Sequence, residues 1–323
     1  MVKLTPELLV DSKCELGEGP IWDPRCNKLL SLDILHSKIF LFDPVTGVNE
    51  MHDLSAHTSS IGTIVPAQGG STSQVVLGVA KGFALYDFET KAFEDHPSNG
   101  SLHSEFTRMN DGKCDPQGRF WLGSVSRTGP GGADLVMGGA SLYVLETWAG
   151  APTKILDGVT VSNGLDWSVD GKTMYYTDSL TFGVDAFDFD GGASSHVALA
   201  TNRRRAVDVS TGFPPVPDGC ALDTQGKLWV ACFGVGEVRR YDPAAGTLLA
   251  TVVLPAEAGT EATACAFGGE ALDELYITTA HEFWDAEKQA KMPIAGGLFK
   301  VSRATLATLG PGIAGVPMHH FKV

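Results

Sequence analysis

The sequence lacks an apolar run long enough to cross a membrane, and it is poor in basic residues. No stretch approaches the roughly 18 apolar residues that a membrane helix requires. The 24 Lys and Arg residues are outnumbered by 38 Asp and Glu residues, which gives a formal net charge of −14. Because nucleic-acid binding requires clustered positive charge, this balance argues against a nucleic-acid partner. The one basic run, Arg203-Arg204-Arg205, is short, and we expect it to lie in a solvated loop.

The pairings typical of disulfide frameworks and zinc sites are also missing. The six cysteines are scattered, with no C-x-x-C pair and no histidine at zinc-finger spacing. Three of them, Cys220, Cys232 and Cys265, fall in apolar strand patterns, where a reduced cysteine behaves as a small apolar side chain. The N-terminus has Pro6 and Glu7 where a signal peptide has its apolar core. We therefore expect a cytoplasmic protein without a membrane partner, either a monomer or a weak oligomer.

What the sequence does contain is a strand pattern that recurs along its whole length. The most regular element is a short strand, rich in β-branched or aromatic residues, that follows a turn. Its six copies align on Leu30, Val76, Trp121, Tyr176, Trp229 and Tyr276. The steps between these positions are 46, 45, 55, 53 and 47 residues. Another strand follows most copies, and strong helical periodicity is absent apart from a turn or two near residues 284–291.

Short strands at even spacing, about four per unit of roughly 50 residues, are typical of a β-propeller. We therefore expect an all-β protein in which residues 1–323 form a single six-bladed β-propeller domain. Its four-stranded antiparallel blades would surround a central channel. A β-sandwich is the alternative, although it seldom repeats the same aromatic and turn pattern six times. The apolar segment Glu7–Val10 is expected to complete the last blade and close the ring, which leaves no open sheet edge.

A polar residue begins the first strand of several copies, followed directly by glycine or, in the third copy, by Asp-Gly. Because the inner strands of a propeller all start at one face of the channel, these leading residues should point toward a common axis. They are Glu18, Asn110, Asn163 and Asp218, with Thr263 in the last copy and no strong ligand in the second. All four side chains offer oxygen, the ligand atom that hard divalent cations prefer. A metal with only a few protein ligands keeps open coordination positions, which permit Lewis-acid catalysis. Two alternatives stay open: ordinary Asp-Gly and Asn-Gly turn dipeptides, and a purely structural metal.

The stretches around these residues also resemble a known family. They are Leu16-Gly17-Glu18-Gly19-Pro20-Ile21-Trp22, Arg108-Met109-Asn110-Asp111-Gly112-Lys113, Ser162-Asn163-Gly164-Leu165-Asp166-Trp167, Tyr175-Tyr176-Thr177-Asp178-Ser179 and Pro217-Asp218-Gly219. In this order they resemble the regucalcin/gluconolactonase family, also called the senescence marker protein family, of six-bladed propeller sugar lactonases. The resemblance covers nearly the whole chain.

This resemblance implies the hydrolysis of a sugar (aldono) lactone to the free sugar acid, with one divalent metal ion at the channel mouth. It implies that Glu18, Asn163 and Asp218 are the metal ligands and that Asp218 is also the catalytic base that activates water. Arg108 and Asn110 would bind the hydroxyl groups or ring oxygen of the small-molecule substrate. The identity of the metal stays open among Ca, Mn, Zn, Mg and Fe. A calcium-binding regulatory propeller without turnover, or a hydrolase of other esters or phosphoesters, are the alternative functions.

The chain departs from this family at one place. Some members have an acidic substrate-contacting residue soon after the strand that matches residues 120–125, whereas this chain reads Ser126-Arg127-Thr128. A glycine-rich loop at residues 129–134 follows, and we hypothesise that it is a mobile lid over the channel. The change of charge leaves the particular sugar undetermined.

Overall fold

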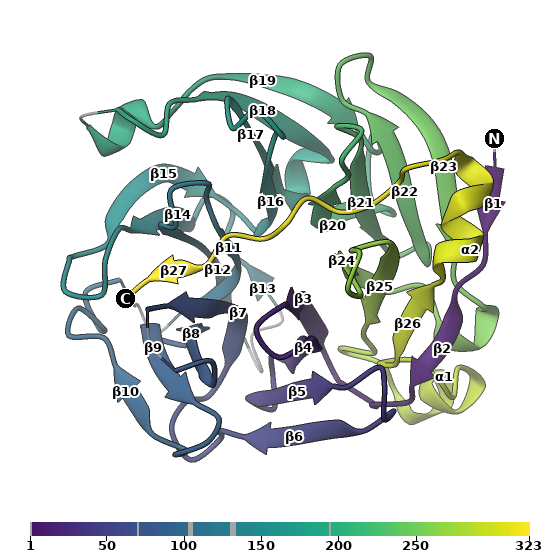
Figure 1. Ribbon diagram of the computed structural model, residues 1–323, viewed down its shortest axis with the longest axis horizontal. Coiled ribbons are helices and arrows are strands. Elements are labelled where there is room, and N and C mark those ends of the chain that lie inside the picture. The colour runs from purple at the N-terminus through teal and green to yellow at the C-terminus, as the bar shows by residue number, and fades with distance from the viewer. Residues whose placement is uncertain (1, 70, 103–105, 130–133, 194) are drawn as a thin grey trace.

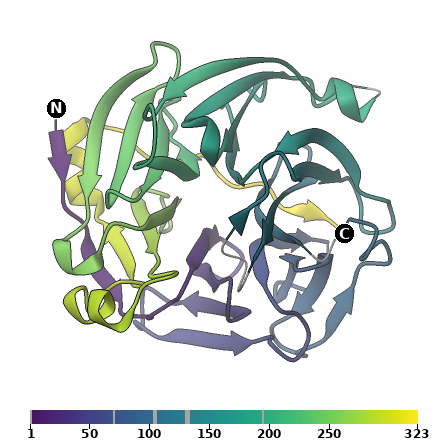
Figure 2. The same ribbon diagram turned by 180° about the vertical axis from the view of Figure 1, so that it is seen from behind.

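The computed structural model describes residues 2–69, 71–102, 106–129, 134–193 and 195–323. In these residues six sheets stand around a common axis and form a six-bladed β-propeller (Figure 1, and from behind in Figure 2). This confirms the predicted fold class. The first strand of each blade lies nearest the axis, so the inner strands together line a central channel.

Four strands, ordered from the channel outward, form the main part of each blade. Blade 1 contains β3 (Gly17–Asp23), β4 (Lys28–Asp33), β5 (Lys38–Phe42) and β6 (Asn49–Asp53), and blade 2 contains β7 (Ile61–Gln68), β8 (Gln74–Val79), β9 (Gly82–Asp87) and β10 (Phe93–Asp95). Blade 3 contains β11 (Thr107–Cys114), β12 (Phe120–Thr128), β14 (Ala140–Leu145) and β15 (Thr153–Val159), and blade 4 contains β16 (Ser162–Trp167), β17 (Thr173–Asp178), β18 (Gly183–Phe189) and β19 (Ala200–Asp208). Blade 5 contains β20 (Val216–Leu222), β21 (Leu228–Phe233), β22 (Glu237–Asp242) and β23 (Thr247–Val253), and blade 6 contains β24 (Ala262–Gly268), β25 (Glu274–Thr279), β26 (Leu298–Val301) and β2 (Glu7–Val10).

Additional short elements complete the molecule. The strand β1 (Val2–Leu4) pairs in parallel with β23, β27 (Phe321–Lys322) pairs in parallel with β7, and β13 (Asp134–Leu135) pairs with the end of β12. The helices are α1 (Ala286–Lys291) and α2 (Arg303–Leu306), with 3-10 turns η2 (Ser179–Thr181), η3 (His196–Ala198), η4 (Ala256–Ala258) and η5 (Ala307–Leu309). The position of α1 confirms the helical turns expected near residues 284–291. Within the described ranges, no helix combines the length and the apolar character that a membrane span requires.

The six positions that align the sequence repeat form the centre of the core. They lie in β4, β8, β12, β17, β21 and β25, and each is 0% exposed: Leu30, Val76, Trp121, Tyr176, Trp229 and Tyr276. Each of the six strands predicted around these positions is observed as the second strand of its blade. The repeat is therefore visible in the sequence because each blade must bury the same position of its second strand against a neighbouring blade.

Buried carboxylates fix two of the core tryptophans. Asp223 Oδ2 accepts hydrogen bonds from Trp229 Nε1 (3.0 Å) and Arg240 Nε (2.8 Å), and Asp115 Oδ2 accepts from Trp121 Nε1 (2.8 Å). Asp223 and Asp115 are both 0% exposed. Because a buried carboxylate is tolerated only when it is paired, these networks are specific to one packing of the blades.

Every inner strand contains a one-residue β-bulge near its start, at the equivalent position of each blade. Between Glu18 and Ile21, for example, β3 advances three residues while its partner β4 advances two. A bulge bends the strand and redirects its side chains. The polar-glycine dipeptides of blades 1, 3, 4 and 5 therefore lie within strands, and the interpretation of them as hairpin turns is wrong.

The glycines of these bulges allow the inner strands to approach each other closely. A Cβ atom on Gly164 would lie 2.6 Å from the Cys220 nitrogen and 2.7 Å from the Asp218 carbonyl oxygen. Both distances are too short for any side chain, and the obstacle is backbone. Glycine is therefore required where β16 passes β20 at the channel.

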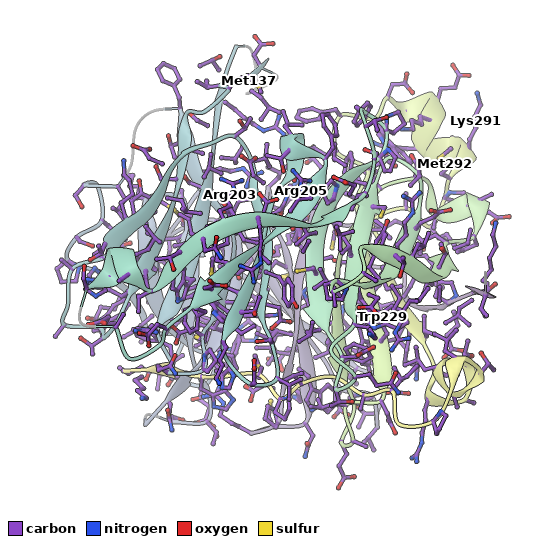
Figure 3. The ribbon with its side chains drawn as sticks, turned by 90° about the horizontal axis from the view of Figure 1, so that it is seen from above. Met137, Arg203, Arg205, Trp229, Lys291 and Met292 are labelled. Carbon is purple, nitrogen blue, oxygen red and sulfur yellow. The ribbon has the colours of Figure 1, made fainter. Side chains whose placement is uncertain are left out.

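The basic run of the sequence lies on β19 and not in a loop, which corrects that prediction. Figure 3 shows Arg203 and Arg205 along this strand. The charges of the run are balanced by acids on the adjacent strand β18: Arg203 Nε lies 2.7 Å and Arg205 Nε 2.9 Å from Asp185, and Arg204 Nη1 lies 2.7 Å from Asp188. The three arginines are exposed, as expected. Two acids on β18 thus pair with a basic edge strand that composition alone assigned to a loop.

The C-terminal segment crosses one mouth of the channel. After α2 the chain runs over the middle of the ring and reaches β27 beside β7 (Figure 1). On the way Gly315 forms a bridge with Asp223. The end of the chain therefore covers one face of the channel, and the opposite face contains the bulged starts of the inner strands.

Candidate functional site

The bulged starts of the inner strands line a cavity of about 290 Å³ at the mouth opposite the C-terminal segment. All five residues proposed from the sequence line it: Glu18, Arg108, Asn110, Asn163 and Asp218. Glu18 and Asn163 are each 5% exposed, Asn110 is 6% and Asp218 is 7%. The structure thus brings together side chains from blades 1, 3, 4 and 5.

The other two blades contribute packing at the equivalent position. Thr263 of blade 6 is 0% exposed, and its hydroxyl donates to the Gly17 carbonyl oxygen at 2.6 Å, outside the cavity. In blade 2, a Cβ on Gly62 would lie 2.3 Å from the Asn110 carbonyl oxygen. Blade 2 therefore leaves space for β11, and the polar groups come from the inner strands of blades 1, 3, 4 and 5.

Glu18 and Asp218 are buried carboxyl groups that perturb each other. Burial is the main cause that raises the pKa of Glu18 to about 8, and the nearby Asp111 raises it further. Burial likewise raises the pKa of Asp218 well above its usual range, followed by the charge of Glu18. The Gly19 N–H donates to Glu18 Oε2 at 2.9 Å and partly opposes the effect. Two such carboxyl groups need either protons or a cation to neutralise them.

The two asparagines are held by hydrogen bonds that continue to a guanidinium. Asn163 Nδ2 donates to Ser179 Oγ at 2.8 Å. Asn110 Nδ2 donates to Asn163 Oδ1 at 3.1 Å and to the Ser162 carbonyl oxygen at 2.8 Å. Arg108 Nη1 donates to Asn110 Oδ1 at 2.6 Å. Since an amide oxygen has two lone pairs, Asn163 Oδ1 can accept from Asn110 and still face a cation.

The chemistry of Glu18, Asn163 and Asp218 fits a divalent metal ion. In the part of the chain that the structure describes, no group of three or more His, Cys, Asp or Glu side chains is arranged to hold a metal. A metal here therefore depends on an amide in addition to two carboxylates. Two carboxylates balance a charge of +2, and an all-oxygen set favours hard cations over zinc-type sites built from His and Cys. Three protein ligands also leave coordination positions for water or substrate.

Several residues of the cavity wall were missed by the sequence analysis. Glu282 and Phe283 come from the loop after β25, and Phe213 from the loop before β20. Burial raises the pKa of Glu282, which is opposed by the charges of Arg127 and Arg108. Phe213 is 68% and Phe283 is 63% exposed at the rim. These loop residues lie outside the repeated strand, so repeat symmetry gives no signal for them.

The loop at residues 129–134 was expected to be a lid, and its residues 130–133 lie outside the described part of the chain. Its flanks are defined. Arg127 and Thr128 of β12 pair with Leu135 and Asp134 of β13. Leu135 lines the cavity. The glycine-rich loop therefore starts and ends beside the site.

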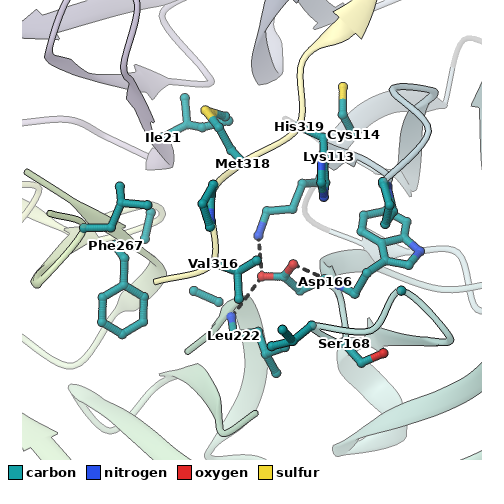
Figure 4. Close-up of a pocket in the computed structure, with 18 of the residues that line it drawn as sticks. Ile21, Lys113, Cys114, Asp166, Ser168, Leu222, Phe267, Val316, Met318 and His319 are labelled. Atoms are coloured by element: carbon teal, nitrogen blue, oxygen red, sulfur yellow. Dashed lines mark hydrogen bonds and ion pairs between the residues drawn. The ribbon is translucent and has the colours of Figure 1, made fainter. Parts of the chain in front are cut away.

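The other end of the channel contains a separate cavity of about 390 Å³ (Figure 4). Lys113 Nζ donates to Asp166 Oδ2 at 2.8 Å, and the Leu222 N–H donates to the same oxygen at 2.9 Å. Met318 and His319 of the C-terminal segment also line this cavity. The inner strands thus present a neutral ion pair at this end and the buried acids at the other.

A narrow neck separates the two ends of the channel. The space there is about 30 Å³ and is lined by residues that include Asp111, Gly112 and Gly219. That volume is about the share of one water molecule in the liquid. Burial raises the pKa of Asp111 to about 6, although the Gly112 N–H donates to its carboxylate at 2.7 Å. Among the described residues, this neck is too narrow for a sugar-sized ligand to pass from the other end of the channel to Glu18 and Asp218.

Comparison with known proteins finds relatives that match along nearly the whole chain. The model of the SMP-30/Gluconolactonase/LRE-like region family matches residues 16–281. The chain is 38% identical to regucalcin of Danio rerio over 325 residues, which covers 99% of each protein. The matched region thus includes all the inner strands.

Solved structures with the same fold are also similar over the whole chain. A calcium-binding protein, regucalcin, from Agrobacterium tumefaciens has a TM-score of 0.84 at 24% identity and covers 100% of this chain and 99% of its own. A luciferin-regenerating enzyme has a TM-score of 0.81 at 26% identity and covers 98% of this chain and 100% of its own. These similarities support the six-bladed architecture and leave the chemistry to the site itself.

Proposed function

Since the chain belongs to the SMP-30/gluconolactonase/LRE-like family, we propose that it catalyses the metal-dependent hydrolysis of a sugar lactone to the free sugar acid. One observation carries this proposal. Two buried carboxyl groups and an amide oxygen, suited to a divalent cation, share a single cavity with an arginine–asparagine pair suited to sugar hydroxyls. A site that only stores a cation does not need the arginine–asparagine pair.

The proposed reaction divides the chemistry between the metal and the protein. A divalent metal supplies Lewis-acid polarisation of the lactone carbonyl when it is bound by Glu18, Asn163 and Asp218. Asp218 accepts the proton of the attacking water at a carboxylate oxygen. This water adds to the carbonyl carbon and the ring C–O bond then breaks. The ring oxygen takes the proton back from Asp218 and becomes a hydroxyl of the sugar acid.

Arg108 and Asn110 orient the substrate. Arg108 is held by its hydrogen bond to Asn110 Oδ1, so its remaining N–H groups have a fixed direction. Its pKa is lowered to about 10, mainly by burial, which still leaves it charged at neutral pH. A fixed fork of donors beside an amide that is both donor and acceptor suits the ring oxygen and hydroxyls of a sugar.

The test is to remove the metal and then the proposed base. Hydrolysis of hexono- and pentonolactones, followed by acid release, should disappear after chelation and return with one of Ca²⁺, Mn²⁺, Zn²⁺, Mg²⁺ or Fe²⁺. Asp218→Asn should lower kcat by at least about 100-fold, the usual size of a lost general base. Asp208→Asn is the matched control, because this aspartate has an 81% exposed side chain on β19.

Full activity after chelation would refute the role of the metal, and full turnover by Asp218→Asn would refute the role of the base. Calcium binding without turnover of any lactone or ester would instead favour the regulatory alternative. Hydrolysis of aryl or phosphate esters in preference to lactones would favour the other hydrolase alternative.

A further inference from the structure

The cavity combines buried polar groups with an apolar rim. The proposed metal donors Glu18, Asn163 and Asp218 are buried, whereas half of the described lining residues are apolar. Two of these apolar residues, Phe213 and Phe283, are exposed aromatic side chains. Apolar side chains form no hydrogen bonds with the hydroxyls of a sugar, and the proposed hydrolysis does not use these two rings. The rim therefore fits a part of the ligand that has an apolar face.

Phe283 is held at the rim by the residue that follows it. Trp284 Nε1 donates to Glu261 Oε1 at 3.0 Å, and the Trp284 indole packs on Gly259, where a Cβ atom would clash with it. Phe283 itself has a φ of 63°, in the left-handed region that a bulky side chain adopts only at a cost in free energy. The anchored tryptophan therefore keeps an exposed ring in a conformation that a free loop would avoid.

Phe283 also reaches over the mouth of the cavity. Its loop follows β25 of blade 6, whereas Arg127 lies on β12 of blade 3, on the opposite side of the ring of blades (Figure 1). The Arg127 guanidinium nevertheless lies over the Phe283 ring, 5.3 Å from the ring centre. Since Arg127 covers one face of a side chain that is still 63% exposed, the other face is open. A group that extends from the buried donors toward solvent therefore passes beside this ring.

Phe213 is fixed by a second loop on the same side of the mouth. Ser210 Oγ donates to the Pro215 carbonyl oxygen at 2.6 Å and so closes the loop around Phe213. The Phe213 ring packs on Gly234, and the Gly234 N–H donates to the Thr260 carbonyl oxygen at 2.9 Å. Thr260 directly precedes the glutamate that anchors the other loop. Both aromatic loops thus rest on one segment between blades 5 and 6.

A sugar ring matches this rim better than an alkyl or aryl group. One face of a pyranose carries C–H groups, whereas its edge carries hydroxyls. The C–H face can cover an aromatic ring and remove apolar surface from water, and the hydroxyls stay hydrated at the open mouth. An alkyl or aryl group would remain partly in water beside rings that are about two-thirds exposed. Glu282, which precedes Phe283 and lines the cavity, adds oxygen acceptors for hydroxyls at the edge of a sugar.

The cavity also has room for more than one ring. Its volume of about 290 Å³ is close to the lower limit, about 300 Å³, of cavities that bury drug-sized ligands. A single hexonolactone is smaller than such a ligand.

We propose, building on the lactonase function above, that the substrate is an aldonolactone with a second sugar attached to it, such as the lactone of a disaccharide aldonic acid. The lactone ring lies at Glu18, Asn163 and Asp218, and the second sugar stacks on Phe283 and Phe213. These two aromatic residues are therefore specificity-determining residues of the site.

The experiment compares three lactones of one ring size: gluconolactone, its glucosylated form (the lactone of cellobionic acid), and gluconolactone benzylated at the same hydroxyl. The wild-type protein should have a kcat/KM at least about tenfold higher for the glucosylated lactone than for gluconolactone, as expected for stacking on two rings. Phe283→Ala and Phe213→Ala should each lower kcat/KM for the glucosylated lactone at least about threefold more than for gluconolactone. Phe283→Tyr keeps the aromatic face and should keep the preference. Val45→Ala is the matched control, because it removes a 90% exposed apolar side chain from the turn between β5 and β6.

A second readout does not depend on turnover. Isothermal titration of the protein in saturating Ca²⁺ with cellobionic acid and with gluconic acid should show tighter binding of cellobionic acid. The double variant Phe213→Ala/Phe283→Ala should lose this difference. The same two acids are used with both proteins, so chelation of metal in solution cancels in the comparison. Thermal denaturation of each variant verifies that it is folded.

The outcomes separate this inference from the proposed function. Equal or better hydrolysis of gluconolactone by the wild-type protein, or equal changes on both lactones in the alanine variants, would overturn the inference while lactone hydrolysis stands. Equal or better hydrolysis of the benzylated lactone than of the glucosylated one would overturn the choice of a sugar. If no lactone is hydrolysed, the proposed function fails, and the titration then decides. Tighter binding of cellobionic acid that requires the two rings supports the sugar subsite, and equal binding of the two acids overturns it.

Discussion

Metal binding at this site should depend steeply on pH, because its two carboxyl groups hold protons when the metal is absent. Burial first, and then nearby negative charge, raises the pKa of Glu18 to about 8 and that of Asp218 well above its usual range. Two pH units below its pKa, a carboxyl group is only about 1% ionised, and each further unit changes this fraction about tenfold. A cation must displace these protons in order to bind.

The expected magnitude follows from that displacement. With at least one proton released per metal, the association constant for Ca²⁺ should rise at least about tenfold from pH 6 to pH 7, or about 1.4 kcal/mol. The increase should flatten above pH 8, where Glu18 becomes ionised in the metal-free protein. Isothermal titration in two buffers of different ionisation enthalpy measures both the affinity and the number of protons released.

The stability of the metal-free protein should change with the same sign. The pKa of Glu18 in the folded protein, about 8, lies above its ordinary value of 4.5. Its protonation therefore stabilises the fold fully below pH 4.5, and this contribution is lost as the pH rises through 8. Tm of the metal-free protein should fall from pH 5 to pH 8, and saturating Ca²⁺ should reduce the fall because it replaces the protons.

Variants identify the source of these protons. Glu18→Gln should reduce the number released, whereas Glu287→Gln, with a 78% exposed side chain on α1, should behave as wild type. An affinity that is the same within twofold at pH 6 and pH 7.5, with no proton released, would refute the reasoning. The carboxyl groups would then be ionised without a metal, and burial would not raise their pKa values.

Two further predictions concern the framework around the site. Gly164→Ala places a methyl group against the backbone of β20, 2.7 Å from the Asp218 carbonyl oxygen, and should weaken Ca²⁺ binding at least about tenfold in titration while the circular dichroism spectrum stays that of a β protein. Asp223→Ala leaves the Arg240 guanidinium and the Trp229 indole N–H buried without their acceptor, and should lower the free energy of unfolding in urea by about 3–5 kcal/mol.

The sequence predicts those parts of the fold that recur in every blade. The positions of Trp121 and Trp229 are detectable because six second strands bury the same position, so the spacing of aromatic residues carries the architecture. The strand β27 has only two residues and pairs in parallel with β7. A segment of two residues has no periodic pattern. Its pairing with β7 depends on the path of the chain across the ring after α2.

The candidate site likewise has residues that the sequence predicts and residues that it does not. Glu18, Asn163 and Asp218 each lie five residues before the residue that opens the turn of their own blade. The repeat alone therefore predicts that they face one axis. The sequence does not indicate the bulges that orient them, because a bulge is a property of the pairing between two strands. Glu282 belongs to a loop that no other blade repeats, and its contribution follows only from the course of that loop at the channel mouth.

The residues of the inner strands and the residues of the rim differ in how many substitutions they tolerate. The proposed metal donors stand on inner strands whose bulges and close contacts tolerate few substitutions, as at Gly164. Glu282 and Phe283 stand on a loop, and Arg127 lies near the end of β12 beside another loop. Substitutions in these outer groups alter the charge at the rim without moving the donors. For the proposed lactonase, specificity for the group that flanks the lactone can therefore vary while the proposed metal donors stay the same.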